Sequence, residues 1–239
     1  MAELVFFTGV MESGKSTLAL QLDHTMTTGG RRGRVFTCDD RAGRQVVTSR
    51  LGLSREAVEV TDGFDFWHHV IGELTHGERL EYLICDEAQF YRPVHVDQLA
   101  RIVDELGLDV YAFGLLTDFR TEIFPGSRRL VELADRLETL QVTPLCWCGA
   151  KATTNTRTVD GWIVTEGDQK LIGDVTAGGS GDGGVVGYEV LCRKHHRSGT
   201  TRKVVALGSA AEPLPLASPD QEPLTVDQET LAVSEDQES

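Results

Sequence analysis

The chain has 239 residues, 40% of them hydrophobic and 25% charged, which is enough for one full hydrophobic core and a small second lobe. This composition excludes collagen-like and wholly disordered proteins. No apolar run approaches the roughly 18–20 residues of a membrane-spanning helix, and residues 1–10 lack the features of a secretory signal. With 37 acidic residues against 23 Lys and Arg, the net charge of −14 disfavours anionic partners. We therefore expect a cytoplasmic protein that binds neither nucleic acid nor a membrane.

Short apolar runs alternate with helical patterns in the first half of the chain. The predicted strands are Leu4–Thr8, Arg34–Cys38, Tyr82–Cys85 and Asp109–Phe113. The predicted helices are Lys15–Thr28, Gly63–His76 and Val94–Leu106. Continuous apolar runs of this length are typical of parallel strands that are buried on both faces. The alternating order therefore predicts an α/β fold, a parallel sheet with helices on both faces.

The composition changes around residue 143, to a pair of cysteines, a Thr-rich segment and a glycine-rich run at 178–187. Beyond residue 205 the chain has eight acidic residues, no Lys or Arg and no aromatic residue. Such a composition buries too little apolar surface to offset the entropy of ordering. We expect a nucleotide-binding domain over 1–142, a smaller domain over 143–205 and a disordered acidic tail over 206–239.

A phosphate-binding motif follows the first predicted strand. The run Gly9-Val10-Met11-Glu12-Ser13-Gly14-Lys15-Ser16 fits G-x-x-x-x-G-K-[ST] between a strand and a helix, as this motif requires. Its backbone N–H groups and the helix N-terminus attract phosphate oxygens. Lys15 is expected to reach the β- and γ-phosphates of ATP, and the Ser16 hydroxyl to ligate Mg²⁺. The predicted phosphate-binding residues here are Gly9, Met11, Ser13, Gly14, Lys15, Ser16 and Thr17.

An acidic pair ends the third predicted strand. Asp86 and Glu87 follow the apolar run Leu83-Ile84-Cys85. Phosphoryl transfer needs a carboxylate near Mg²⁺ and a group that acts on the attacking nucleophile. We assign the first role to Asp86 and the second to Glu87.

Three of the five cysteines are spaced as metal ligands. Cys38 and Cys85 fall in predicted strands and are expected to be buried apolar side chains. The others form a C-x-C and a C-x-x-H pair, which together supply the four ligands of a closed zinc site. The predicted zinc ligands are Cys146, Cys148, Cys192 and His195, with His196 as the alternative fourth ligand.

These separated motifs, in this order, resemble the type II thymidine kinases, the cytosolic zinc-containing group that phosphorylates thymidine with ATP. The resemblance covers most of residues 3–198. It is carried by the phosphate loop, Asp86-Glu87-Ala88-Gln89-Phe90, Gly114-Leu115, Asp118-Phe119, Phe124, the two ligand pairs, and Tyr188 four residues before Cys192.

The resemblance implies a P-loop NTPase-like fold with a small zinc-binding lasso domain, in which 178–187 belongs to the lasso loop. It makes Glu87 the general base for the 5′-hydroxyl and adds Gln89, Asp39 and Arg41 to the phosphate-binding set. The walls of the thymine pocket are then Met11, Phe90, Leu115, Phe119, Phe124 and Tyr188.

The partners that the resemblance implies are thymidine, ATP, Mg²⁺ and Zn²⁺, with thymidine triphosphate as a feedback inhibitor and a homotetrameric assembly. Deoxyuridine is a plausible second substrate. Two other functions compete with this one. The first is another P-loop small-molecule kinase, and the second is a nucleotide-dependent zinc-knuckle binding module.

Overall fold

A six-stranded parallel sheet forms the centre of the computed structural model, which describes residues 1–38, 46–49, 52–167, 169 and 184–209. The strand order is β5-β2-β6-β7-β1-β8, and every pairing is parallel. The strands are β1 (Leu4–Thr8), β2 (Gly33–Thr37), β5 (Val58–Glu59), β6 (Tyr82–Asp86), β7 (Asp109–Gly114) and β8 (Arg136–Thr139). The prediction of a parallel α/β sheet is confirmed.

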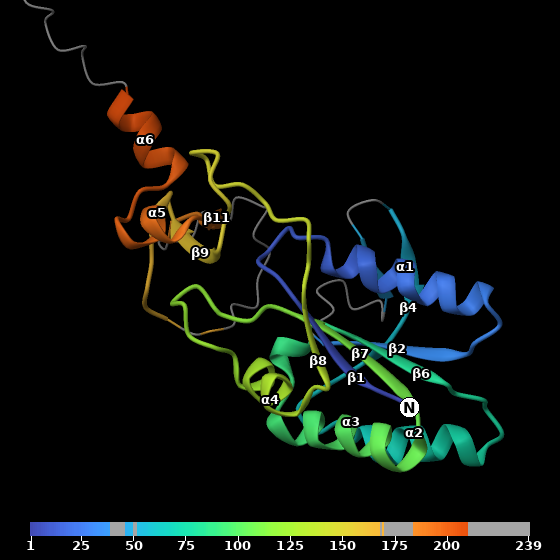
Figure 1. The fold of residues 1–239 in the computed structure, drawn as a ribbon. Coiled ribbons are helices and arrows are strands. Elements are labelled where there is room, and N and C mark those ends of the chain that lie inside the picture. Colours follow the sequence, from blue (N-terminus) through green and yellow to red (C-terminus); the bar gives the residue numbers. More distant parts are fainter. Residues whose placement is uncertain (39–45, 50–51, 168, 170–183, 210–239) are drawn as a thin grey trace, which may run out of the picture.

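Helices cover both faces of this sheet (Figure 1). On one face lies α1, and on the other lie three helices whose apolar side chains form the larger core cluster. The helices are α1 (Lys15–Thr28), α2 (Phe66–Thr75), α3 (Pro93–Leu106) and α4 (Pro125–Leu133). The sheet is therefore shielded from water on both sides, as its continuous apolar strands require.

The predicted start and end of an element are accurate where a motif and the hydrophobic pattern indicate the same boundary. β1 and α1 have the predicted bounds, whereas α2 is three residues shorter at its start than predicted. There Asp65 adopts an extended conformation, and its Oδ1 accepts a 2.8 Å hydrogen bond from the N–H of His68. This cap satisfies one of the free N–H groups of the first turn and begins the helix at Phe66.

A second lobe is built on the antiparallel sheet β10-β9-β11 and packs at one end of the central sheet (Figure 1). Its elements are β9 (Thr154–Val159), β10 (Trp162–Ile163), β11 (Val186–Leu191), α5 (Arg193–Arg197) and α6 (Arg202–Ser209). Two further elements complete the fold, a hairpin of β3 (Val46–Thr48) and β4 (Ser54–Glu56), and the short 3₁₀ helix η1 (Ala88–Phe90).

The glycine-rich run at 178–187 and the predicted tail over 206–239 lie largely outside the described residues. Of the glycine-rich run, residues 184–187 are described, and the last two of them begin β11. Helix α6 begins where Thr201 Oγ1 accepts from Val204 N at 3.2 Å, and it continues to Ser209, four residues into the predicted tail. Residues 210–239 are not described.

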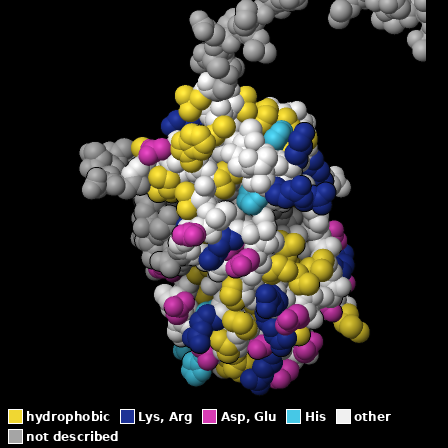
Figure 2. Space-filling model, turned by 90° about the vertical axis from the view of Figure 1, so that its left-hand side faces the viewer, with side chains coloured by type: hydrophobic (Ala, Val, Ile, Leu, Met, Phe, Trp, Pro, Cys, Tyr) yellow, Lys and Arg dark blue, Asp and Glu magenta, His cyan; other side chains and the backbone are white. Residues whose placement is uncertain are grey.

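On the face drawn in Figure 2, acidic and basic side chains are interspersed over the central-sheet lobe. No single large acidic patch is visible among the described residues on that face. No helix in the described part of the chain is both long and apolar enough to cross a bilayer.

Candidate nucleotide and nucleoside site

The phosphate loop and the acidic pair meet at the carboxyl edge of the central sheet. The loop follows β1, Asp86 ends β6, and β7 pairs with both strands. The segment after β7, which begins at Leu115, therefore emerges between the two motifs. Ligands of open α/β sheets bind in the crevice outside this edge. Here the edge opens into a cavity of about 470 Å³.

Most predicted site residues line this one cavity, although they come from four separate segments of the chain. They are Met11, Gly14, Lys15, Ser16, Thr17, Asp86, Glu87, Gln89, Phe90, Leu115, Phe119, Phe124 and Tyr188. Asp39 and Arg41 lie outside the described residues. Gly9 and Ser13 belong to the same loop but are not part of the cavity wall.

The phosphate loop has the tight geometry that its glycines permit. Gly14 has φ +85°, and a Cβ at Gly9 would lie only 2.6 Å from Ser13 Oγ. The Ser13 hydroxyl is buried and has no hydrogen-bond partner among the described residues. A loop of this shape directs backbone N–H groups inward, where phosphate oxygens can accept from them.

Lys15 folds back over the loop. Its Nζ donates to the carbonyl oxygens of Val10 at 2.9 Å and Gly9 at 3.3 Å. Burial lowers the pKa of Lys15, while the nearby charges of Glu87 and Asp86 act in the opposite direction. The ammonium group therefore lies between the phosphate loop and the acidic pair.

Asp86 is almost completely buried at the end of β6. Burial, together with the charge of Glu87, raises the pKa of Asp86 to about 7, and a hydrogen bond from Ser16 opposes that rise. The carboxyl group of Asp86 and the hydroxyl group of Ser16 thus place two hard oxygen donors side by side. These are the donors that Mg²⁺ prefers in nucleotide sites.

Glu87 is held in a conformation that is rare for residues other than glycine. It has φ +54°, and its Oε2 accepts a 2.5 Å hydrogen bond from Gln89 Nε2. Gln89 Oε1 in turn accepts from the N–H of Leu115 at 3.0 Å. Gln89 can come this close because Gly114 has no side chain. A Cβ at this position would lie only 2.9 Å from Gln89 Oε1. Strained conformations of this kind are concentrated at functional sites, and here the strained residue is the carboxylate that lines the cavity.

Aromatic side chains form the other end of the cavity. Phe90 and Phe124 meet edge to face, with ring centroids 5.6 Å apart. Phe119 and Phe124 are buried, and Tyr188 on β11 faces the same cavity. Flat apolar walls beside a few polar groups are suited to a planar ring system. The cavity therefore has a phosphate end and an aromatic end.

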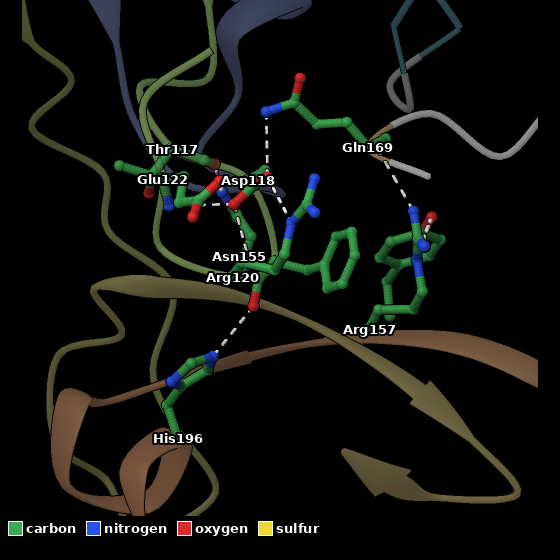
Figure 3. Close-up of polar contacts among 10 residues, drawn as sticks. Thr117, Asp118, Arg120, Glu122, Asn155, Arg157, Gln169 and His196 are labelled. Carbon is green, nitrogen blue, oxygen red and sulfur yellow. Dashed lines mark hydrogen bonds and ion pairs between the residues drawn. The ribbon is translucent and has the colours of Figure 1, made fainter. Parts of the chain in front are cut away.

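Four polar side chains join the second lobe to this site (Figure 3). Asn155 Oδ1 accepts from Met11 N at 2.7 Å, and its Nδ2 donates to Thr117 O at 2.9 Å. The others are Arg157, Gln169 and His196, which contact the loop that follows β7. The motifs single out His196 only as a possible zinc ligand and the other three not at all, because these contacts connect segments that are far apart in the sequence.

The four predicted zinc ligands come together in the second lobe. The ligand atoms of Cys146, Cys148, Cys192 and His195 all lie within 4.8 Å of one another. His195 Nδ1 is 3.4 Å from the sulfur of Cys146 and 3.4 Å from that of Cys192. The alternative ligand, His196, points elsewhere, with its Nε2 3.1 Å from the carbonyl oxygen of Phe119.

Comparison with known proteins decides the family. The family model described as thymidine kinase matches residues 2–196. The chain belongs to the thymidine kinase family. Thymidine kinases of Cutibacterium acnes and Streptomyces coelicolor are each 56% identical to it, over 90% and 94% of this chain and 97% and 99% of theirs. The thymidine kinase of Lactobacillus johnsonii is 38% identical over 82% of this chain and 96% of its own.

Among solved structures, Pif1 helicases from Candida albicans and Bacteroides align with TM-scores of 0.36 and 0.32, at 17% and 20% identity. Each alignment covers 58% of this chain, which spans 36% and 38% of the respective helicase chains.

Membership of the thymidine kinase family makes the chain an enzyme of the transferase class. It also decides between the alternatives that the motifs left open. The zinc-knuckle binding module is set aside, and the P-loop belongs to a kinase.

Proposed function

We propose that the chain transfers the γ-phosphoryl group of ATP to the 5′-hydroxyl of thymidine, giving thymidine monophosphate, and that it accepts deoxyuridine as well. The observation that carries this proposal is the single cavity of a thymidine kinase family member in which a phosphate loop, a carboxylate and an aromatic pocket meet. A nucleoside seated among the aromatic rings has its sugar between them and the phosphate loop.

In the proposed reaction Glu87 accepts the proton of the 5′-hydroxyl as that oxygen attacks the γ-phosphorus. The bond from the γ-phosphorus to the bridging oxygen of the β-phosphate breaks, and ADP leaves. Lys15 and the backbone N–H groups of the phosphate loop stabilise the charge on the phosphate oxygens. The hydrogen bond from Gln89 orients the carboxylate of Glu87 for this role.

Mg²⁺ would be held by Ser16 and Asp86, which are already in contact with each other. When bound, the ion neutralises charge on the β- and γ-phosphates. Asp39 and Arg41 are proposed as further phosphate ligands from the family resemblance alone.

Zinc would be held by the three cysteines and His195, a donor set that leaves no coordination position for substrate. The ring of Trp147 stacks on His195 with centroids 4.2 Å apart, and its Nε1 donates to Thr200 O at 3.0 Å. We therefore propose a structural zinc site, which fixes β9 and β11 against the nucleoside end of the cavity.

The aromatic end would hold the thymine ring, with walls formed by Met11, Phe90, Leu115, Phe119, Phe124 and Tyr188. Thymidine triphosphate would inhibit by placing its base there and its phosphates on the loop, since one cavity contains both ends. The homotetramer and the cytoplasmic location remain predictions from the resemblance and the sequence.

The test is a panel of nucleosides incubated with the purified chain, Mg²⁺ and γ-labelled ATP. Label should appear in thymidine monophosphate and in deoxyuridine monophosphate. Equal or faster phosphorylation of deoxycytidine or of a purine nucleoside would contradict the proposed substrate and favour another small-molecule kinase.

A further inference from the structure

Arg157 is a buried arginine on β9, with a side chain just behind the wall of the nucleoside cavity. Only 2% of the residue is exposed to solvent. In the described part of the chain, no Asp or Glu lies within ion-pair distance of it, and its interactions there are with aromatic rings and neutral oxygens. A buried guanidinium is costly to desolvate, so its position calls for a reason.

The guanidinium contacts two aromatic residues of the cavity, one from the loop after β7 and one from the second lobe. Its Cζ lies 3.8 Å from the ring centroid of Phe119 and 5.8 Å from that of Tyr188. Its Nε donates to Tyr188 Oη at 3.3 Å. Phe119 comes from the kinase lobe and Tyr188 from β11, so that one side chain fixes two walls contributed by different lobes.

Gln169 closes this arrangement, as Figure 3 shows. Its backbone oxygen accepts from Arg157 Nη2 at 3.3 Å, and its Nε2 donates to Asp118 Oδ2 at 3.0 Å. Asp118 also accepts from the N–H groups of Arg120 and Glu122, at 2.8 and 3.0 Å. The turn that bears Phe119 is thus anchored through its backbone, while Arg157 anchors the ring.

We propose that Arg157 is a positioning residue for the nucleoside pocket, which sets the separation and tilt of Phe119 and Tyr188. The proposal rests on the proposed function, since it concerns the pocket assigned there to thymine. A flat guanidinium can stack on one ring and donate in its own plane to the other residue, which an ammonium group cannot do. Because Arg157 is not part of the cavity wall, it acts through the two aromatic residues.

The test compares Arg157→Met and Arg157→Lys with wild type in steady-state kinetics with thymidine and ATP varied separately. Methionine keeps much of the apolar length but loses the charge and the donors, whereas lysine keeps the charge, an apolar stem and N–H donors but lacks the flat guanidinium. In Arg157→Met the KM for thymidine should rise about 10- to 100-fold, as expected when a desolvated cation–π contact and its hydrogen bonds are lost. The KM for ATP should stay within about twofold. Arg157→Lys should show an intermediate KM for thymidine.

Arg101 provides a matched control, because its guanidinium stacks on Trp67 at 3.6 Å on the outer surface, with half its side chain exposed. Arg101→Met should leave both KM values unchanged. The Tm of Arg157→Met should stay within about 4 °C of wild type, a small shift for a chain of this size.

The proposal is overturned if Arg157→Met binds thymidine with an unchanged KM. It is also overturned if the KM values for both substrates and the Tm worsen together, because that pattern indicates a purely structural residue. If wild type itself fails to phosphorylate thymidine, the proposed function falls and this role falls with it. If wild type phosphorylates thymidine and Arg157→Met has the same KM for it, the role of Arg157 is rejected while the proposed function stands.

Discussion

The backbone N–H of Met11, at the tip of the phosphate loop, donates a 2.7 Å hydrogen bond to Asn155 Oδ1 of the second lobe. The side-chain amide of Asn155 also donates from Nδ2 to Thr117 O at 2.9 Å, and only 4% of Asn155 is exposed. One buried side-chain amide on β9 therefore connects the phosphate loop to the loop that follows β7. The geometry of the phosphate end thus depends on how the second lobe is docked.

Replacing Asn155 with Leu should lower kcat/KM by about 10- to 100-fold, because the N–H of Met11 is left without a partner and the loop tip is no longer fixed. Asn155→Asp keeps an acceptor for Met11 but places a buried carboxylate oxygen against Thr117 O, so it should lower kcat/KM as well. Steady-state kinetics of the two variants provide the check. Equal activity of Asn155→Leu and wild type would show that this bond does not hold the loop in a productive geometry.

Glu87→Gln should keep the fold and lose most of the turnover, because the amide has the same shape but cannot accept the proton. Loss of a general base typically lowers the rate by about 10²- to 10⁴-fold. The kcat should fall by that factor, while the far-UV circular dichroism and the Tm remain those of wild type. An unchanged kcat in a well-folded variant would remove Glu87 from the catalytic role.

Metal analysis should find about one zinc per chain, and both Cys192→Ser and His195→Ala should lose it, since each removes one of four ligands. His196→Ala is the matched control, because its ring contacts Phe119 O and not the cysteine cluster. It should retain zinc. If His196→Ala lost zinc and His195→Ala retained it, His196 would be the fourth ligand in place of His195.

His196→Ala should have a separate effect on the nucleoside. Without the contact to Phe119 O, the turn that bears this ring loses one of its anchors, and the Kd for thymidine should rise about 3- to 10-fold, as for a neutral hydrogen bond. Isothermal titration of thymidine into the zinc-loaded variant measures this directly. Wild-type affinity would mean that the helix of the zinc lobe does not help to order the pocket.

The central sheet could be predicted because its strands and helices are marked by neighbouring residues in the sequence. The first four residues of Leu4–Thr8 are apolar and the glycine-rich motif follows the strand at once, so both the strand and the start of α1 are marked in the sequence. By contrast, the strand Arg136–Thr139 was missed because it is a polar strand at the edge of the sheet. β9 was also missed, because its buried side chains include polar residues such as Asn155 and Arg157, which give no apolar pattern.

The site shows the same division. The predicted zinc ligands and the predicted phosphate-binding residues of the glycine-rich loop follow from motif spacing, because residues one to three positions apart must lie close together, whereas Gln89, Asp39 and Arg41 follow only from the family resemblance. The choice between His195 and His196 needed the fold, since the two are adjacent in sequence and differ only in direction. Gln169 could not be anticipated at all, because its contacts to Asp118 and Arg157 span the two lobes.

The central claim is that this chain phosphorylates thymidine at a site shared by the phosphate loop and Glu87. The most direct test is a single-turnover experiment with γ-labelled ATP, Mg²⁺ and excess purified chain, in which wild type and Glu87→Gln are compared on thymidine and on 5′-deoxythymidine. We predict that wild type labels thymidine at the 5′-oxygen and leaves 5′-deoxythymidine unlabelled, and that Glu87→Gln labels thymidine about 10²- to 10⁴-fold more slowly. Label on 5′-deoxythymidine, or an equal rate of labelling in Glu87→Gln, would contradict the account.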